Sequence, residues 1–148
     1  MLVSQKDRYA FRALFELAKR GDGEPVKVAD IAEAQSIPSR FLEVILHELK
    51  GAGFVGSRRG KHGGYLLVRD PARLTLGDVM RFLEGPIEVA RRDPDDSHGS
   101  GPGGFCVFEP IWGKMSEAIA DVFDGTTFAE LVEEEKRRAE TYVPTYAI

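Results

Sequence analysis

The sequence predicts a mainly α-helical fold in which three short helices precede a β-hairpin and a long helix follows later. Apolar residues recur at helical spacing over residues 5–20, 28–34 and 39–52, and glycine or proline stands at the boundaries. Two runs rich in aromatic and branched residues follow, at residues 54–58 and 65–68, with a glycine-rich segment between them. Three helices followed by such a hairpin are the winged helix-turn-helix layout, with the hairpin as a two-stranded wing.

Capping residues support the helix boundaries. Ser4 is followed three residues later by Asp7, which resembles a capping box at the start of the first helix. Thr75 and Thr127 are in position to cap two later helices, expected over residues 76–83 and 128–139. A longer helix, expected over residues 105–123, precedes the last of these.

The third helix has one apolar stripe and one polar side. We expect its inward face to be formed by Phe41, Leu42, Ile45, Leu46 and Leu49. The polar residues Ser39, Arg40, Glu43 and His47 then lie on the other faces. In a winged helix this third helix enters the major groove of DNA.

Length and composition indicate one soluble domain with a helical arm. The chain has 148 residues, of which 43% are hydrophobic and 30% charged. We expect a winged helix-turn-helix domain over residues 1–85, a flexible loop over 86–104 and a helical dimerisation region over 105–148. The loop is expected because residues 93–104 include no apolar side chain able to anchor them.

Charge is divided unevenly along the chain. Residues 1–70 hold 12 Lys/Arg and 9 Asp/Glu, a net charge of +3, whereas residues 71–148 hold 8 and 15, a net charge of −7. Between Leu49 and Tyr65 there are four cationic residues and no carboxylate. Nucleic-acid binding needs local rather than global positive charge. We therefore expect the hairpin to contact the phosphate backbone of DNA.

Four short segments carry a resemblance to a known protein family. Residues 37–46 read Ile-Pro-Ser-Arg-Phe-Leu-Glu-Val-Ile-Leu, and residues 59–67 read Arg-Gly-Lys-His-Gly-Gly-Tyr-Leu-Leu. Together with Leu-Thr-Leu-Gly-Asp-Val at 74–79 and Glu-Gly-Pro at 84–86, they resemble the iron–sulfur cluster regulator (IscR-type) family of bacterial transcription regulators. The family also contains nitric-oxide-sensing repressors and the master repressor of cysteine metabolism. The resemblance implies a sequence-specific DNA-binding regulator, most commonly a repressor, that dimerises through a long C-terminal helix.

This reading assigns two sets of residues to two partners. For double-stranded DNA, expected as a palindromic operator, the contact residues are Ser39, Arg40 and Glu43 in the major groove, with Arg58, Arg59, Lys61 and His62 on the wing. The helix over residues 105–123 carries more apolar residues than one small domain can cover. For the homodimer, the expected interface residues are Ile111, Trp112, Met115, Ile119, Val122 and Phe123.

Cysteine content separates this chain from the cluster-binding members. They carry three cysteines before the dimer helix and a fourth ligand, whereas here only Cys106 matches, with Pro94 and Ser100 near the other two positions. Glu109 stands where one branch has a histidine ligand. Iron–sulfur clusters need about four ligands, mainly thiolates. We therefore expect no cofactor and no metal, and Cys106 stays open as a redox-sensing thiol, a dimer-bridging ligand or an inert remnant.

The sequence also bears on other function classes. An enzyme needs a nucleophile with a base, a carboxylate pair or a phosphate loop, and the sequence has none that is recognisable. A protein-interaction module that has lost DNA binding is the alternative, as is a cluster- or thiol-based redox regulator. Among DNA-binding regulators, a small-molecule effector and a protein effector both stay open.

The cellular location of the protein can be predicted from the length of its apolar runs and the charge of its first residues. No apolar run approaches the roughly 18 to 20 residues that span a bilayer, and residues 1–12 are too charged for a secretory signal. We expect a cytoplasmic protein with no membrane partner.

Overall fold

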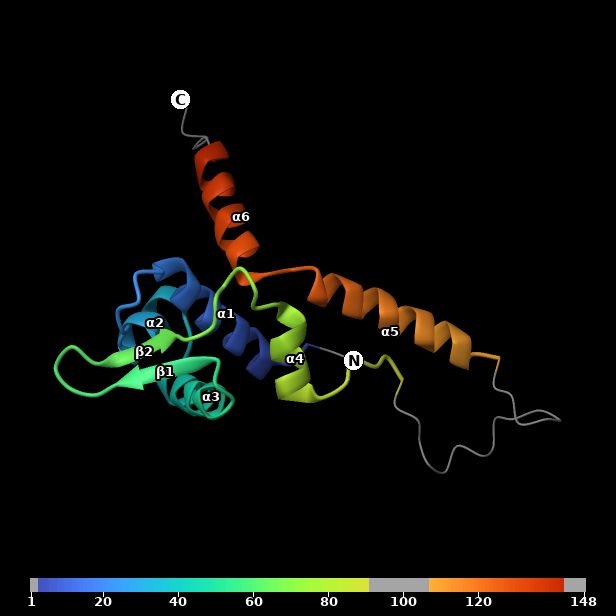
Figure 1. Ribbon diagram of the computed structural model, residues 1–148, viewed down its shortest axis with the longest axis horizontal. Helices are drawn as coiled ribbons and strands as arrows, with labels where there is room; N and C mark the ends of the chain where they lie inside the picture. Colours follow the sequence, from blue (N-terminus) through green and yellow to red (C-terminus); the bar gives the residue numbers. More distant parts are fainter. Residues whose placement is uncertain (1–2, 91–106, 143–148) are drawn as a thin grey trace.

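The computed structural model describes residues 3–90 and 107–142, which form a mainly α-helical winged fold (Figure 1). This confirms the predicted fold class. In chain order the elements are α1 (Gln5–Arg20), α2 (Val28–Gln35), α3 (Ser39–Gly51), β1 (Val55–Arg58), β2 (Gly64–Leu67), α4 (Leu76–Glu84), α5 (Glu109–Asp124) and α6 (Phe128–Thr141). The helices and strands of the winged half begin and end within one or two residues of the predicted boundaries.

Helices α1, α2 and α3 share one core with the base of the hairpin. Each helix contributes residues at i, i+3, i+4 spacing, so one face is buried. Fully or almost fully buried core residues include Ala10, Leu14, Leu17, Ile31, Leu42, Leu46, Leu49 and Val55. This core fixes the angle between α2 and α3 and thereby positions α3 at the surface.

The predicted capping box of α1 and the two predicted threonine N-caps are present, and both threonines also form full capping boxes. The Ser4 amide donates to Asp7 Oδ2 at 2.7 Å, and the Asp7 amide donates to Ser4 Oγ at 3.2 Å. The same reciprocal pattern starts α4 at Thr75 and α6 at Thr127. Each box satisfies backbone N–H groups that would otherwise lack partners at the helix start.

Phe41 does not join the core, which corrects the predicted inner stripe of α3. Its side chain is 64% exposed, whereas Leu42, Ile45, Leu46 and Leu49 are buried. Successive helical residues are about 100° apart, so Phe41 lies on the flank of the stripe that Leu42 centres. The core needs only the four residues at 42, 45, 46 and 49.

The core extends past residue 85, the predicted end of the winged-helix domain. Phe128 and Val132 of α6 are buried with the residues of α1 and α3. Two backbone hydrogen bonds fix this position: the Phe128 amide donates to Leu74 at 3.1 Å, and the Leu76 amide donates to Thr126 at 3.0 Å. Helix α6 therefore packs on the winged half, although it lies within the predicted dimerisation region.

Helix α5 begins at Glu109, later than the predicted start at residue 105. Pro110 lies in its first turn. Proline is tolerated there but would clash with the carbonyl four residues earlier in a longer helix, so the sequence around Pro110 starts the helix. Residues 105 and 106 lie outside the described residues, as does most of the predicted flexible loop, but Ile87 at its start is buried.

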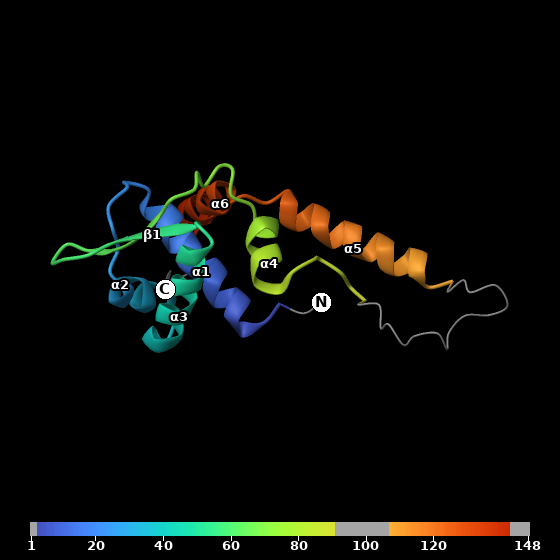
Figure 2. The same ribbon diagram turned by 60° about the horizontal axis from the view of Figure 1, so that its bottom comes forward.

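Helix α5 projects from the body formed by the other elements (Figure 1, Figure 2). None of its residues is buried within this chain. In the described parts of the chain, no helix is both long and apolar enough to cross a membrane.

Candidate nucleic-acid interface

Helix α3 presents a polar stripe on the side opposite the core. Arg40, Glu43, His47 and Lys50 recur every three or four residues and are all exposed. This spacing aligns the four side chains along one face of a helix. Such a face carries donors that match guanine edges or phosphate and, at Glu43, an acceptor that matches a cytosine amino group.

The start of α3 has no side-chain cap. Pro38 is the N-cap residue, and its ring offers no hydrogen-bond acceptor to the amides of the first turn. Uncapped amides at a helix start, together with the helix dipole, favour an anion. Ser39 and Arg40 are exposed at this end of the helix, so the position suits a DNA phosphate.

The wing is a short antiparallel hairpin anchored to the body by its second strand. Val55 pairs with Leu67 and Arg58 with Gly64, and Tyr65 exchanges two backbone hydrogen bonds with Val26, at 2.7 and 2.8 Å. A side chain at Gly64 would collide with the Val26 carbonyl, so glycine is needed for this close approach. At the tip, Gly60 has φ +110°, a backbone conformation that favours glycine.

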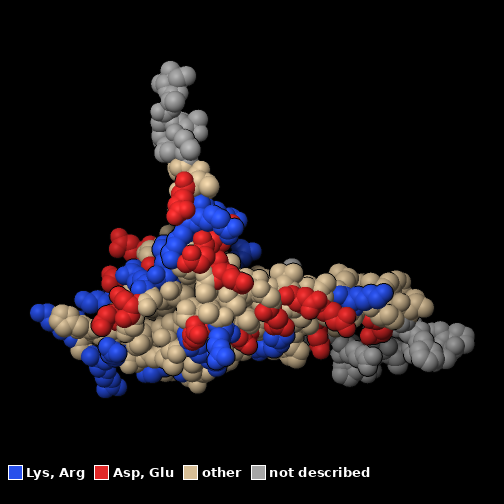
Figure 3. Space-filling model, turned by 45° about the horizontal axis from the view of Figure 1, so that its top comes forward, with Lys and Arg blue, Asp and Glu red and all other residues tan. Residues whose placement is uncertain are grey.

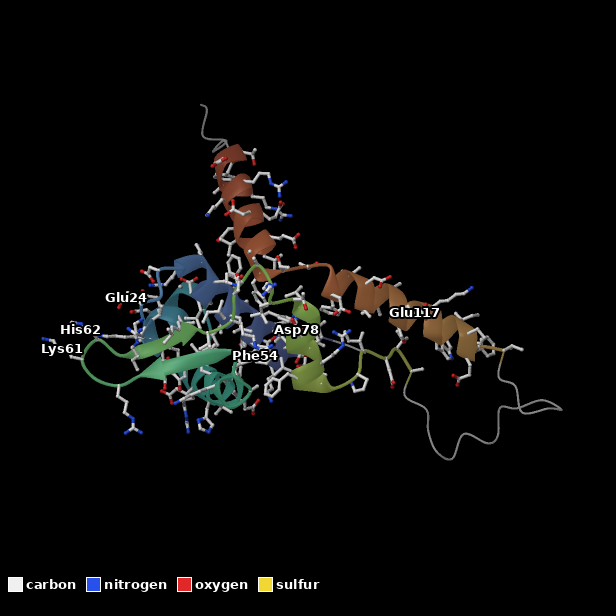
Figure 4. All side chains as sticks on the ribbon, viewed as in Figure 1. Glu24, Phe54, Lys61, His62, Asp78 and Glu117 are labelled. Carbon is white, nitrogen blue, oxygen red and sulfur yellow. The ribbon has the colours of Figure 1, made fainter. Side chains whose placement is uncertain are left out.

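Three of the predicted DNA contacts lie in the tip beyond the paired residues. Arg59, Lys61 and His62 are all exposed. Lys61 and His62 lie at the far end of the wing, and Lys and Arg side chains gather at the same end of the molecule in the space-filling view (Figure 3, Figure 4). Acidic side chains line much of α5 in that view and also lie among basic side chains on the rest of the molecule.

Arg58 and Lys50 have partners within the protein. Arg58 Nη1 lies 4.0 Å from the Glu24 carboxylate in the turn before α2, a weak contact between exposed groups. Lys50 Nζ donates to Ser57 Oγ at 2.6 Å and so links the end of α3 to β1. The hydrogen bond from Lys50 joins the end of the α3 stripe to the wing. Arg58 instead contacts the turn before α2.

The predicted interface residues of α5 fall into two groups. Ile111, Trp112, Met115 and Val122 are exposed, and Val122 retains 68% of its accessible surface. Ile119 and Phe123 are half-buried, and the Phe123 ring stacks on Phe11 of α1 at 6.3 Å between ring centroids. The second group therefore also packs against its own chain.

Two exposed apolar residues before α5 were absent from the predicted interface. Val107 and Phe108 are exposed, and the Phe108 ring stacks on Trp112 with centroids 6.2 Å apart. They lengthen the apolar surface of α5 at its N-terminal end. Their apolar character was visible in the sequence, but their exposure depends on how α5 leaves the body.

The donor set of the chain does not suit an iron–sulfur cluster. Cys106 is the single cysteine and lies outside the described residues. Within residues 3–90 and 107–142, no group of three or more His, Cys, Asp or Glu side chains is placed to hold a metal ion. One thiol per chain falls short of the usual four ligands.

Comparison with known proteins identifies the family. The model of the Rrf2 family, described as iron-dependent transcriptional regulators, matches residues 3–134. The chain belongs to the Rrf2 family. It is 32% identical over 143 residues to the HTH-type transcriptional regulator CymR of Bacillus subtilis, covering 97% of this chain and 98% of CymR. It is 33% identical over 132 residues to IscR of Yersinia pseudotuberculosis, covering 89% and 79%.

Solved structures agree with this assignment. CymR, the global cysteine regulator of B. subtilis, superposes with a TM-score of 0.76 at 33% identity, covering 90% of this chain and 98% of that one. T. potens IscR gives a TM-score of 0.78 at 31% identity, covering 99% and 97%. As a member of the Rrf2 family, the protein is a DNA-binding transcription regulator and not an enzyme. The resemblance drawn from the wing and α3 is confirmed.

Proposed function

We propose that the protein is a homodimeric repressor that binds a palindromic operator through α3 and the wing. The observation that carries the proposal is the pairing of two exposed surfaces on one chain. One is the polar stripe of α3 with the cationic wing tip, and the other is the unburied apolar face of α5. The first surface suits DNA and the second suits another protein chain.

The α5 face supports the dimer. Ile111, Met115 and Val122 lie on one side of a 16-residue helix, which is about 24 Å long at 1.5 Å per residue. Exposed apolar surface on this scale marks an interface. A closed pair of identical chains has two-fold symmetry, so its two α3 helices meet two half-sites of opposite orientation.

The two DNA-contacting elements have different roles in this proposal. Ser39, Arg40 and Glu43 read the major groove, whereas Arg59 and Lys61 contact phosphates or the minor groove, with His62 beside them. Arg58 contributes charge from the strand. Repression is the outcome we propose, since it is the commoner one among the regulators that the sequence resembles.

The last part of the proposal is that the protein responds to an effector without an iron–sulfur cluster. One cysteine per chain leaves too few thiolates, so a small molecule or a protein partner is the proposed effector. In this proposal the winged half binds DNA, residues 86–104 link it to α5, and α5 forms the dimer interface.

Binding to a selected palindromic site and to scrambled DNA, measured over a salt series, tests the proposed function. We expect tighter binding to the palindrome, a two-chain mass by light scattering, and affinity that falls steeply with salt. A promoter–reporter fusion whose signal rises when the gene is deleted tests repression. Equal affinity for both DNAs at every salt concentration contradicts sequence-specific binding.

A further inference from the structure

Val44 lies in the middle of the outward face of α3. It follows Arg40 by four residues and precedes His47 by three, and residues at these spacings are neighbours on a helix surface. Because successive helical residues are about 100° apart, the Val44 side chain lies about 150° from the middle of the buried stripe of α3. Val44 therefore stands within the polar stripe, although it is apolar.

The fold of the chain does not account for an apolar residue at this position. Val44 retains 57% of its accessible surface and is not part of the core. Valine also forms helices less readily than alanine, so helix formation does not favour it. Single exposed apolar residues are ordinary on protein surfaces, but this one is surrounded by the polar residues Arg40, Glu43 and His47. Its neighbours are the groups that suit DNA.

The position of the Val44 methyl groups is fixed relative to the wing. Both methyl groups are attached at Cβ, and one χ1 rotamer predominates for valine in helices. Helix α3 is itself held by its buried stripe and by the hydrogen bond of 2.6 Å from Lys50 to Ser57 of β1. In both ribbon views α3 lies beside the base of the wing (Figure 1, Figure 2). Val44 is thus part of the same surface as the other proposed DNA contacts.

The major groove of DNA offers one apolar group to such a side chain. Thymine presents its C5-methyl group there, whereas adenine, guanine and cytosine present only ring nitrogen, carbonyl or amino groups. Valine neither donates nor accepts a hydrogen bond, so a polar base edge held against it would lose water without gaining a partner. Thymine is therefore the base that a valine at this position favours.

We propose that Val44 contacts the methyl group of one thymine in each half-site of the operator. This inference rests on the proposed operator binding and adds an apolar contact to the polar contacts of Arg40 and Glu43. The Cβ atoms of Arg40 and Val44 are about 5–6 Å apart, as is usual for residues four apart, and stacked bases are about 3.4 Å apart. The thymine then lies within about two base pairs of the base that Arg40 contacts.

Removal of single methyl groups from the DNA tests the contact. Deoxyuridine pairs with adenine as thymine does and lacks only the C5-methyl group. A palindromic site is first selected from random duplexes with the full-length protein, and each thymine is then replaced by deoxyuridine. We expect one position at which the wild type binds about fourfold more weakly per half-site, the loss expected for one buried methyl-sized group. If no thymine shows this dependence, the proposal is overturned.

Val44→Ala tests whether this residue is responsible. The variant lacks the methyl groups that meet the DNA, so it should bind the thymine site about as weakly as the wild type binds the deoxyuridine site. Its own response to deoxyuridine should be less than about twofold, because the two changes remove one and the same contact. An undiminished response in Val44→Ala overturns the proposal. Circular dichroism checks that the variant folds.

Phe41→Ala is the matched control on the same helix. Phe41 is also apolar and is 64% exposed, but it lies on the flank of α3, about 90° from the middle of the buried stripe. We expect Phe41→Ala to respond to deoxyuridine as the wild type does. If the response is lost in Phe41→Ala and kept in Val44→Ala, Phe41 makes the thymine contact and the proposal is overturned.

A methyl group added to cytosine provides an independent test. At the sensitive position, 5-methylcytosine places a methyl group in the major groove while keeping a C·G pair. The wild type should bind this site about fourfold more tightly than the site with unmodified cytosine, and Val44→Ala should not distinguish the two. Equal binding of both sites by the wild type overturns the proposal.

Two outcomes separate the Val44 contact from the proposed function. Equal affinity of the wild type for the selected site and scrambled DNA contradicts operator binding itself. A preferred site without any dependence on thymine methyl groups contradicts only the Val44 contact. A weaker dimer in Val44→Ala by light scattering, with an unchanged response to deoxyuridine, assigns Val44 to a contact between protein chains and also overturns the proposal.

Discussion

Arg81 of α4 binds Asp124 at the end of α5 through two hydrogen bonds, of 2.6 and 2.7 Å. A two-pronged guanidinium–carboxylate pair fixes orientation as well as distance. Its hydrogen bonds hold the pKa of Asp124 below the ordinary value. A side chain at Gly77, one turn earlier on α4, would collide with the same Asp124 carboxylate. Gly77 therefore leaves the space in which this pair orients α5.

Gly77→Ala should destabilise the protein, although alanine is usually the better helix residue. The substitution normally gains about 0.5–1 kcal/mol in a helix. Here the added methyl group displaces the Asp124 carboxylate from its place beside Arg81, and we expect the loss of the pair that orients α5 to outweigh this gain. Urea unfolding followed by circular dichroism measures the change in free energy.

Two further variants isolate the cause. Gly51→Ala on α3, where an added methyl group meets no atom within 4 Å, should not destabilise the protein. Gly77→Ala combined with Asp124→Ala should recover stability relative to Gly77→Ala alone, because the clash is removed. If the double variant is less stable than Gly77→Ala, the Asp124 carboxylate is not what the methyl group displaces.

Glu16 makes stability depend on pH in the acid range. Its carboxylate is buried and accepts hydrogen bonds from Gln35 Nε2 at 2.7 Å and Arg20 Nε at 2.9 Å. Burial raises the pKa of Glu16, but the bonds from Gln35 and Arg20 together outweigh it, and the net pKa lies below the ordinary 4.5. A lowered folded-state pKa contributes stability that is present above pH 4.5 and is lost as pH falls through the folded value.

Glu16→Gln should therefore destabilise the protein at pH 7 more than at pH 3.5, a difference that urea titrations at the two values measure. Glu33→Gln, a change at an exposed glutamate of α2, is the matched control and should alter neither value appreciably. A Glu16→Gln penalty that is the same at both pH values would contradict the assigned role of the carboxylate.

Met115→Glu should dissociate the dimer. Met115 is 42% exposed on the apolar side of α5, and a carboxylate there would be buried unpaired in the pair of chains. We expect a one-chain mass by light scattering at concentrations where the wild type is dimeric. Lys114→Glu, on the adjacent exposed position, changes the charge more and should leave the mass unchanged. Dimeric Met115→Glu protein would exclude this face of α5 as the interface.

Protein purified without oxygen should be colourless and contain no stoichiometric iron, because a single Cys106 per chain supplies too few thiolates. Visible absorbance and iron analysis measure this. Peroxide treatment should affect the operator affinity of Cys106→Ser and of the wild type alike, because we expect no redox role for this thiol; a peroxide response that the substitution removes would contradict this. A brown protein with two or more irons per dimer would show that another ligand set completes a cluster.

Local features of the fold were readable from the sequence. Helix α1 has the predicted bounds because its capping box and its apolar period are both encoded in its own 16 residues and the N-cap residue Ser4 just before them. The wing followed from glycine spacing and branched residues in the same way. Each signal involves neighbours along the chain, and no tertiary contact opposes it.

Features that depend on distant contacts were not readable. Phe41 is apolar and large, like a core residue. Only the packing of α1 against α3 shows that it lies beside the buried stripe of α3 and not in it. Phe128 joins the core because its amide reaches the carbonyl of Leu74, 54 residues earlier. The collision of a Gly77 side chain with Asp124 likewise requires the angle between α4 and α5. Apolar periodicity alone specifies which face is buried, not what covers it.

The wing and α3 should fail in different ways when altered. Arg59 is exposed at the wing tip, where we propose that it neutralises phosphate or enters the minor groove, so Arg59→Ala should weaken binding to all sequences alike. Each lost phosphate contact should reduce the slope of log affinity against log salt by about one. Glu43→Ala should leave that slope nearly unchanged, because a carboxylate facing a cytosine amino group releases no counterion.

Sequence preference separates the two variants further. Glu43→Ala should relax discrimination at one base pair of each half-site, by about 1–3 kcal/mol, while binding to scrambled DNA stays close to wild type. Glu33→Ala on α2, an exposed carboxylate outside the α3 stripe, controls for the general loss of negative charge. Affinities of wild type and the three variants for the selected palindrome, single-base variants and scrambled DNA, each over a salt series, measure both effects. If Arg59→Ala binds every DNA like the wild type at every salt concentration, the wing does not contact DNA through this residue. If Glu43→Ala discriminates between bases as the wild type does, the Glu43 carboxylate instead pairs with His47 or Lys50 within α3.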